Sequence, residues 1–139
     1  MSAIPHQAGC VAINGRGLLL EGPPGVGKSS LALALIDRGA TLVGDDGVLL
    51  EARDRVLWAL PPPNIAGLLE VRNVGLAMLP AEPARVALVV RLDPAATRLP
   101  ECAEQAVLAG VRVPLIRLWP DAPALPLRAE WALTLHGTA

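Results

Sequence analysis

The segment Gly22–Ser29 constrains this chain more than any other part of its sequence. It has the pattern G-x-x-x-x-G-K-S, and it contains Lys28, the one lysine among 12 basic residues. A short apolar run precedes it at 18–20, and good helix formers follow it at 30–38, before a glycine at position 39. This order of strand, glycine loop and helix predicts a helix N-terminus that faces an anion.

The pattern is that of a Walker A loop, a loop that binds nucleotide phosphates. Its glycines let successive amides point at phosphate oxygens, its lysine reaches the outer phosphates, and its serine can ligate Mg²⁺. A chance match in a chain rich in glycine and proline is the alternative, and the flanking strand, helix and cap favour the loop. The expected nucleotide-binding residues of this stretch are Gly22, Pro23, Pro24, Gly25, Val26, Gly27, Lys28, Ser29 and Ser30.

Size and composition exclude several classes of protein. With 139 residues the chain is expected to form one domain, and a net charge of −1 gives no reason to expect nucleic acid or an anionic membrane as a partner. No apolar run reaches the roughly 18 residues that span a bilayer. Cys10 and Cys102 are too few for a disulfide framework, so we expect both to be reduced and structural, in a cytoplasmic protein. Phe and Tyr are absent, so the core must consist of Leu, Val, Ala and Ile, with three tryptophans as the only large rings.

The pattern of apolar runs and turn residues predicts many strands and few helices. Asn14-Gly15 is a strong hairpin signal, and almost no helix is expected between Gly39 and Pro100. The chain should therefore have an α/β fold with a mixed, largely antiparallel sheet, a phosphate-binding loop and flanking helices. Strands are expected at 11–13, 18–21, 41–44, 48–51, 56–60, 74–79, 86–92 and 111–118, and helices at 30–38, 102–109 and 127–135.

Two adjacent carboxylates, Asp45 and Asp46, end a short apolar strand sixteen residues after Ser29. Such a pair can divide its work, one aspartate ligating Mg²⁺ while the other points at an attacking hydroxyl. The alternative is an acidic turn, because Asp45-Asp46-Gly47 is also good turn chemistry. The glycine loop upstream favours the functional interpretation.

Glu70 and Arg72 are a second candidate pair. Strand alternation would place them on one face, about 7 Å apart. They could supply a metal or phosphate ligand and a phosphate-facing guanidinium, or they could be a surface ion pair worth under about 1 kcal/mol. The run 86–93 is a rival metal-binding strand, but Arg91 interrupts it and Asp93-Pro94 favours a turn. His136 is assigned no function.

Three stretches of the chain together resemble the catalytic domain of HPr kinase/phosphorylase. The first is 15–29, with the glycine loop. The second is 31–46, in which 37–46 is similar to the family's RG-x-x-LVADD, and the third is 67–76, in which 68–76 is similar to its LIEIRGLGI signature. The double aspartate at this spacing from the loop, followed by Glu-x-Arg, is much more specific than the loop alone. The resemblance covers about the first 80 residues.

The resemblance implies a fold like that of phosphoenolpyruvate carboxykinase. It also implies Mg²⁺-dependent phosphoryl transfer from ATP to a serine of HPr, the phosphocarrier protein of a phosphotransferase system. Members of the family also catalyse the reverse, phosphorylase reaction. The resemblance implies that Asp45 is the catalytic base, with His6 as a further catalytic candidate. Lys28 and Arg72 would bind the nucleotide, and Ser29, Asp46 and Glu70 would hold the metal. A homo-oligomer, hexameric as in the family, is expected.

The chain departs from the family pattern at several positions. Ser30 stands where the family has an acidic residue, Asn73 replaces a glycine and Gly44 replaces an alanine. The spacing of the family's histidine falls on Gln7, one residue after His6. The family's N-terminal domain is absent, so residues 1–139 are expected to be a single catalytic domain of the short alphaproteobacterial type. A nucleotide-sensing regulatory module with weakened catalysis is the alternative. A small-molecule kinase of the ordinary fold is weaker, because no helical lid with clustered arginines is present.

Overall fold

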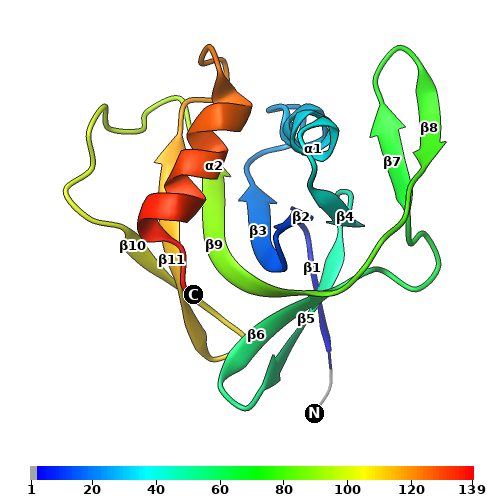
Figure 1. The fold of residues 1–139 in the computed structure, drawn as a ribbon, viewed down its shortest axis with the longest axis horizontal. Helices are drawn as coiled ribbons and strands as arrows, with labels where there is room; N and C mark the ends of the chain where they lie inside the picture. Colours follow the sequence, from blue (N-terminus) through cyan, green and yellow to red (C-terminus); the bar gives the residue numbers. More distant parts are fainter. Residues whose placement is uncertain (1–2) are drawn as a thin grey trace.

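The computed structural model describes residues 3–139. Figure 1 shows a twisted sheet with two helices lying against it, and a hairpin of two strands that stands apart. In chain order the elements are β1 (Ile4–His6), β2 (Gly9–Ile13), β3 (Arg16–Glu21), α1 (Lys28–Asp37), β4 (Thr41–Gly44), β5 (Val48–Arg53), β6 (Val56–Leu60), β7 (Leu68–Val71), β8 (Gly75–Met78), β9 (Ala84–Leu92), β10 (Glu104–Leu108), β11 (Val111–Leu118) and α2 (Leu125–His136).

Nine strands of the described part form one sheet, and β7 and β8 pair separately. The contacts of β9 with β3 and with β11 are parallel, and the other named strand pairs are antiparallel. β3 pairs along one edge of β9. On the other edge, β6 pairs with the beginning of β9 and β11 pairs with its end. The predicted α/β fold with a mixed, largely antiparallel sheet is confirmed.

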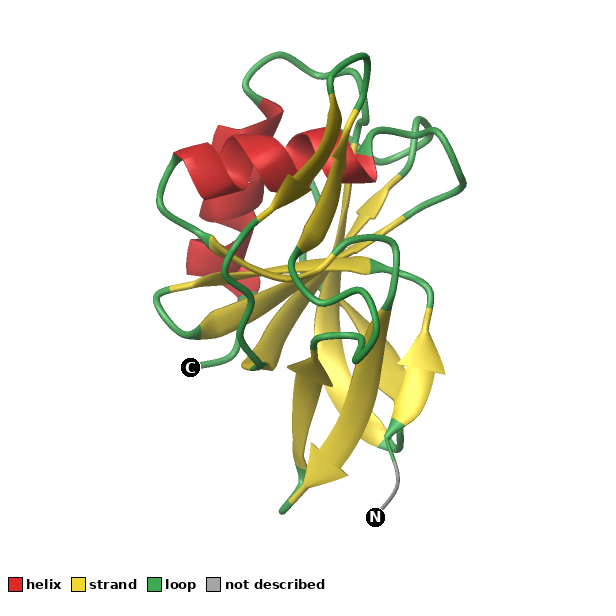
Figure 2. Cartoon of the chain, turned by 90° about the vertical axis from the view of Figure 1, so that its right-hand side faces the viewer, coloured by secondary structure: helices red, strands yellow, loops and turns green. Residues whose placement is uncertain are grey.

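Two apolar clusters hold the sheet from its two faces. One joins buried residues of β3 and β9 to both helices, among them Leu18, Leu35, Leu88 and Leu133. The other contains Leu19 and lies on the opposite face, among residues of β2, β5, β6, β9 and β11. Neighbouring leucines of β3 enter different clusters because successive side chains of a strand point to opposite faces. Figure 2 shows both helices on one side of the sheet.

A β-bulge between β3 and β9 provides a hydrogen bond to the end of the chain. Gly17 pairs with Val86, but the next residue, Leu18, pairs with Leu88, so Ala87 has no partner opposite it. The Ala87 carbonyl accepts a hydrogen bond of 2.9 Å from the amide of Thr138. The segment that follows α2 is therefore fixed to the start of the parallel strand pair.

Most predicted elements are present, and one is wrong. Residues 102–109 were expected to be helical, yet Glu104–Leu108 is strand β10, paired antiparallel with β11. The Ala109-Gly110 turn has positive φ at both residues and closes this hairpin. Strand β1 was not predicted either. It has three residues with Pro5 at its centre, and it pairs with β5.

Both cysteines are free, but only one belongs to the core. Cys10 is fully buried, and burial raises the pKa of its thiol to about 12. Cys102 is exposed, so its predicted structural role is wrong. The core otherwise has the expected composition of small and aliphatic side chains. Among the described residues, no helix has the length and apolarity needed to span a membrane.

Candidate functional site

The glycine loop links the end of β3 to the start of α1, and it lies at the mouth of a cleft of about 430 Å³. Gly25 and Gly27 have φ of 80° and 112°, and no atom lies within 4 Å of the place where either would carry a Cβ. A side chain there would fill open space inside the loop and force a backbone conformation that L-residues rarely adopt. Both glycines line the cleft, so their positive φ rather than a steric contact explains the need for glycine.

The N-terminus of α1 opens into this loop. Gly27 is its N-cap, no side chain caps it, and its first turn contains no acidic residue. The first amides of a helix have no partner within the helix, so they are free to bind an anion, and the helix dipole favours negative charge there. Lys28 begins the helix, and its ammonium group donates a hydrogen bond of 2.6 Å to the carbonyl of Gly22. This hydrogen bond joins the start of α1 to the first residue of the glycine loop.

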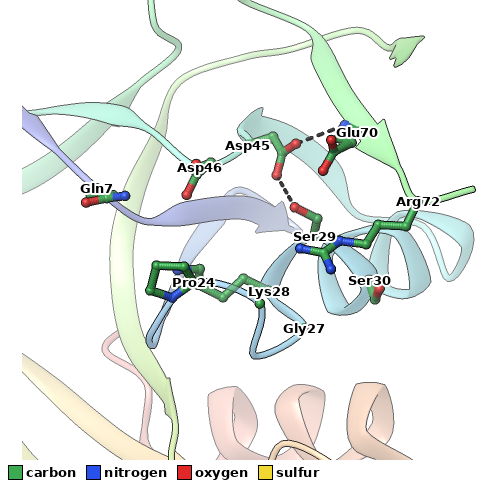
Figure 3. Close-up of a pocket in the computed structure, with 11 residues that line it drawn as sticks. Gln7, Pro24, Gly27, Lys28, Ser29, Ser30, Asp45, Asp46, Glu70 and Arg72 are labelled. Atoms are coloured by element: carbon green, nitrogen blue, oxygen red, sulfur yellow. Dashed lines mark hydrogen bonds between the residues drawn. The ribbon is translucent and has the colours of Figure 1, made fainter. Parts of the chain in front are cut away.

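Asp45 connects three elements around the cleft. Its Oδ1 accepts a hydrogen bond of 2.6 Å from Ser29 Oγ, and its Oδ2 accepts one of 2.9 Å from the backbone amide of Glu70 (Figure 3). The carboxylate thereby joins the loop between β4 and β5 to α1 and to strand β7. It is half-buried and oriented by two donors, while each of its oxygens keeps a lone pair for a further donor.

Asp46 has a different environment, although it is the next residue. Its φ of 57° is left-handed, a conformation that aspartate tolerates better than most residues. Its side chain is exposed and lines the same cleft. Because the chain turns at this residue, both carboxylates reach the cleft, and only Asp45 is bonded to Ser29.

The hairpin of β7 and β8 supplies the far wall of the cleft. Glu70 lies on β7, and Arg72 lies just after it in the turn, so the two do not share a continuous strand as the sequence predicted. Both nevertheless line the cleft. Figure 3 shows the Arg72 side chain extending toward Ser29 and Ser30. The cleft thus has two cationic and three acidic side chains from distant parts of the chain.

His6 and Gln7 face different surroundings. Gln7 lines the cleft, whereas His6 is not among the lining residues and its Nε2 lies 2.9 Å from Glu21 Oε2. Alternation along an extended segment explains why these neighbours point in different directions. The predicted catalytic role of His6 therefore receives no support from its position.

A charge cluster that was not predicted from the sequence surrounds Glu21, the residue directly before the glycine loop. Glu21, the last residue of β3, is 9 % exposed, and it bonds His6 from β1 and Arg91 from β9, with Arg91 Nη2 2.6 Å from its Oε1. The hydrogen bond from His6, together with the Arg91 guanidinium, holds the pKa of Glu21 below its ordinary value, against the opposite effect of burial. Charged residues at matching positions of two apolar parallel strands were the available signal, because Glu21 and Arg91 are register partners.

The carboxylate and hydroxyl oxygens of the cleft suit a hard cation, and Lys28 and Arg72 suit a phosphate ligand. Carboxylate and hydroxyl oxygens are the ligands that Mg²⁺ uses, and Ser29, Asp45, Asp46 and Glu70 present them around one space. Within residues 3–139, no group of three or more His, Cys, Asp or Glu side chains is arranged as a ready metal site.

Comparison with known proteins shows the family to which the chain belongs. Residues 2–81, more than half of the chain, match the family model of the HPr serine kinase C-terminal domain. The chain belongs to this family. A structure of the Hpr(Ser) kinase/phosphatase from Coxiella burnetii is similar, with a TM-score of 0.83 and 28% identity, covering 94% of this chain and 88% of that one.

Curated relatives give the same family. The HPr kinase/phosphorylase of Streptococcus sanguinis is 38% identical over 120 residues, which are 76% of this chain and 39% of that protein. The one from Streptococcus thermophilus is 37% identical over 122 residues, 78% of this chain and 40% of that protein. The chain thus spans about two fifths of the length of these relatives.

Proposed function

We propose that this chain is a catalytic domain that transfers the γ-phosphoryl group of ATP, with Mg²⁺, to a serine of an HPr-like phosphocarrier protein. One observation carries the proposal: the glycine loop, the aspartate pair and the β7–β8 hairpin converge on a single cleft. The family membership and the names of the relatives support the acceptor. The phosphoenolpyruvate carboxykinase-like fold and the phosphate-binding role of the loop are parts of this proposal.

Lys28 and the first amides of α1 would bind the outer phosphates, and Arg72 would face them from the opposite wall. Ser29, Asp46 and Glu70 would hold Mg²⁺, which neutralises developing charge on the phosphoryl group. Ser29 can donate its proton to Asp45 and still offer an oxygen lone pair to a metal, so its observed hydrogen bond is compatible with this role.

Asp45 would accept the proton of the attacking serine hydroxyl. The serine oxygen forms a bond to the γ-phosphorus, the bond from that phosphorus to the bridging oxygen of ADP breaks, and the proton passes to the Asp45 carboxylate. Ser29 and the Glu70 amide fix the orientation of this carboxylate in advance. In the reverse phosphorylase reaction, an oxygen of inorganic phosphate would bond to the phosphoserine phosphorus, the bond from that phosphorus to the serine oxygen would break to give pyrophosphate, and Asp45 would return a proton to the serine oxygen.

The test compares the two aspartates. We expect Asp45→Asn to lower transfer of labelled γ-phosphate to HPr by about 10²–10⁴-fold while nucleotide binding persists, as for loss of a general base. Asp46→Asn should instead weaken metal binding, and added Mg²⁺ should recover part of its activity. Asp121→Asn, an exposed aspartate outside the cleft, is the matched control. Undiminished transfer by the Asp45→Asn variant would remove Asp45 from the mechanism.

A nucleotide-sensing module that does not catalyse transfer is the second candidate. It is favoured by Gln7, because an amide that cannot take up a proton lines the cleft at the position where the family resemblance places a histidine. ATP would then change the affinity for a partner protein without turnover. Measuring ATP affinity beside phosphoserine formation on HPr separates the two: binding without transfer supports the sensor. The hexameric assembly and the cytoplasmic location stay predictions.

A further inference from the structure

A second cavity lies at the opposite end of β3 from the glycine loop. Its volume is about 210 Å³, and Arg16, Arg55, Arg85 and Arg112 line it. We call it the arginine pocket. In Figure 1 it corresponds to the region where the β5–β6 turn, the β10–β11 turn and the C-terminus approach one another, away from α1.

The charge of the arginine pocket is unusual for this protein. Four of the 12 basic residues of a chain with net charge −1 meet there, and no aspartate or glutamate lines the cavity. Among the described residues, no carboxylate forms an ion pair with any of the four guanidinium groups. Several arginines elsewhere, such as Arg38, Arg91 and Arg117, are paired.

Sheet register places two of these arginines side by side. Arg16 of β3 and Arg85 of β9 are direct partners in the parallel pair. Like charges at paired positions of neighbouring strands destabilise a sheet. Arg16 offsets part of this cost, because its guanidinium donates to the carbonyls of Thr138 and Leu133 near the end of α2. Arg85 has no such partner among the described residues, so the pair leaves positive charge available at the cavity.

The conformation of the turn that contains Arg55 is a third observation that points to an anion site. Three hairpins have two-residue turns with positive φ at both positions, and the second residue is Gly15 in one and Gly110 in another. In the β5–β6 turn this second residue is Arg55, with φ of 67°. Glycine is favoured there because it has no Cβ, so an arginine costs local stability. The chain keeps this costly side chain where it lines the cavity.

We propose that the arginine pocket binds a small, multiply charged oxyanion at a site separate from the glycine loop. The guanidinium fork fits phosphate and carboxylate groups alike, so the shared chemistry is a compact anion with two or more charges. Drug-sized ligands occupy pockets of roughly 300–1,000 Å³, so a cavity of 210 Å³ suits a smaller ligand. Because the arginines are largely exposed, affinity for the anion falls as salt rises.

Amide NMR titrations of the full chain, without Mg²⁺, test this inference with pyrophosphate and with citrate as probes. We expect saturable shifts at the amides of 55–57, 85–87 and 111–113, apart from any shifts in the glycine loop. Arg55→Gly and Arg112→Gln should each weaken this binding about tenfold or more, as for loss of a charge-assisted hydrogen bond. The tighter of the two probes identifies the phosphate or the carboxylate class.

The Arg55→Gly variant also separates a loss of anion binding from a loss of folding. It removes the strained arginine, so its melting temperature should equal or exceed that of the wild type while its affinity for the anion falls. Arg98→Gln is the matched control, because Arg98 is exposed and lies outside the pocket. Equal weakening by Arg98→Gln, shifts that never saturate, or shifts confined to the glycine loop would overturn the proposal.

Discussion

The environments of the two adjacent aspartates show what single residues contribute to the cleft. Asp45 is fixed by Ser29 and by the Glu70 amide, whereas Asp46 is exposed at a left-handed turn. A pattern of two aspartates predicts a shared task but cannot say which one is held in place. That difference follows from the backbone turn at Asp46, which the turn chemistry of Asp45-Asp46-Gly47 indicated without saying which carboxylate it would expose.

Glu21 allows a prediction of pH dependence. Its pKa lies below the ordinary value of 4.5 in the folded protein, first because of the hydrogen bond from His6 and then because of Arg91. A lowered pKa means that the charged form stabilises the fold at pH above about 5, and that this stabilisation is lost as pH falls through the folded value. The wild type should therefore lose stability in this acidic range partly through Glu21.

The variant Glu21→Gln should lose about 1–3 kcal/mol of unfolding free energy at pH 7, because the partly buried, charge-assisted hydrogen bond to Arg91 is weakened. The loss should shrink between pH 7 and pH 3, because the wild-type carboxyl is progressively protonated as pH falls toward its lowered pKa. Urea denaturation at both pH values measures this. Glu82→Gln, an exposed glutamate without an ion pair among the described residues, should stay within about 0.5 kcal/mol of the wild type. A Glu21→Gln deficit of the same size at both pH values would contradict the assignment.

At the scale of elements, the turn of the β7–β8 hairpin requires a residue with a left-handed backbone conformation. Asn73 in its turn has φ of 68°, and the amide of Val74 bonds the Val71 carbonyl at 2.9 Å. Asparagine and glycine both tolerate this left-handed conformation, which gives a physical reason why asparagine can stand where the family resemblance has glycine. The replacement therefore leaves the hairpin that carries Glu70 intact.

We expect Asn73→Gly to leave the hairpin unchanged, whereas Asn73→Val should cost about 1–2 kcal/mol because a β-branched residue resists positive φ. The hydrogen exchange of amides in β7 and β8 should then accelerate about tenfold or more in the valine variant. Leu76→Val, at an exposed position of β8 without a φ requirement, is the control. Equal exchange in the valine and glycine variants would show that the turn does not need a left-handed residue.

Local signals predicted elements well where hydrophobic pattern and turn chemistry agreed. The strands around Asn14-Gly15, helix α1 and strand β11 are all present. They failed at residues 102–109, which were expected to form a helix but contain strand β10. Pairing with β11 overrides that weak propensity. The Glu21–Arg91 contact could not be predicted from local pattern, because it depends on register between strands 70 residues apart.

At the scale of the whole molecule, the sheet separates the two cavities. The parallel strands β3 and β9 begin at the arginine pocket, and β3 ends at the glycine loop. Apolar clusters on both faces hold these strands, so the loop is anchored on a rigid support rather than on a mobile segment. A ligand in the cleft would contact α1, the β4–β5 connection and the β7–β8 hairpin at once.

Ligand binding to such a convergent site should stabilise the entire fold. A ligand that binds only the folded state at 100 times its Kd adds about 2.7 kcal/mol, which is roughly 10 °C in melting temperature for a domain of this size. We expect this shift with Mg-ATP by differential scanning fluorimetry, and a smaller one with ATP and EDTA, since the acidic side chains of the cleft oppose phosphate without a cation.

Lys28→Ala should abolish most of that shift, because Lys28 lies in the loop that would grip the phosphates. Its own melting temperature should change little, since the side chain makes one hydrogen bond, to the Gly22 carbonyl, among the described residues. The Asp45→Asn variant should keep the shift, because it retains the loop and α1. If Lys28→Ala responds to Mg-ATP as strongly as the wild type, the nucleotide binds elsewhere, and the glycine loop loses the role proposed for it.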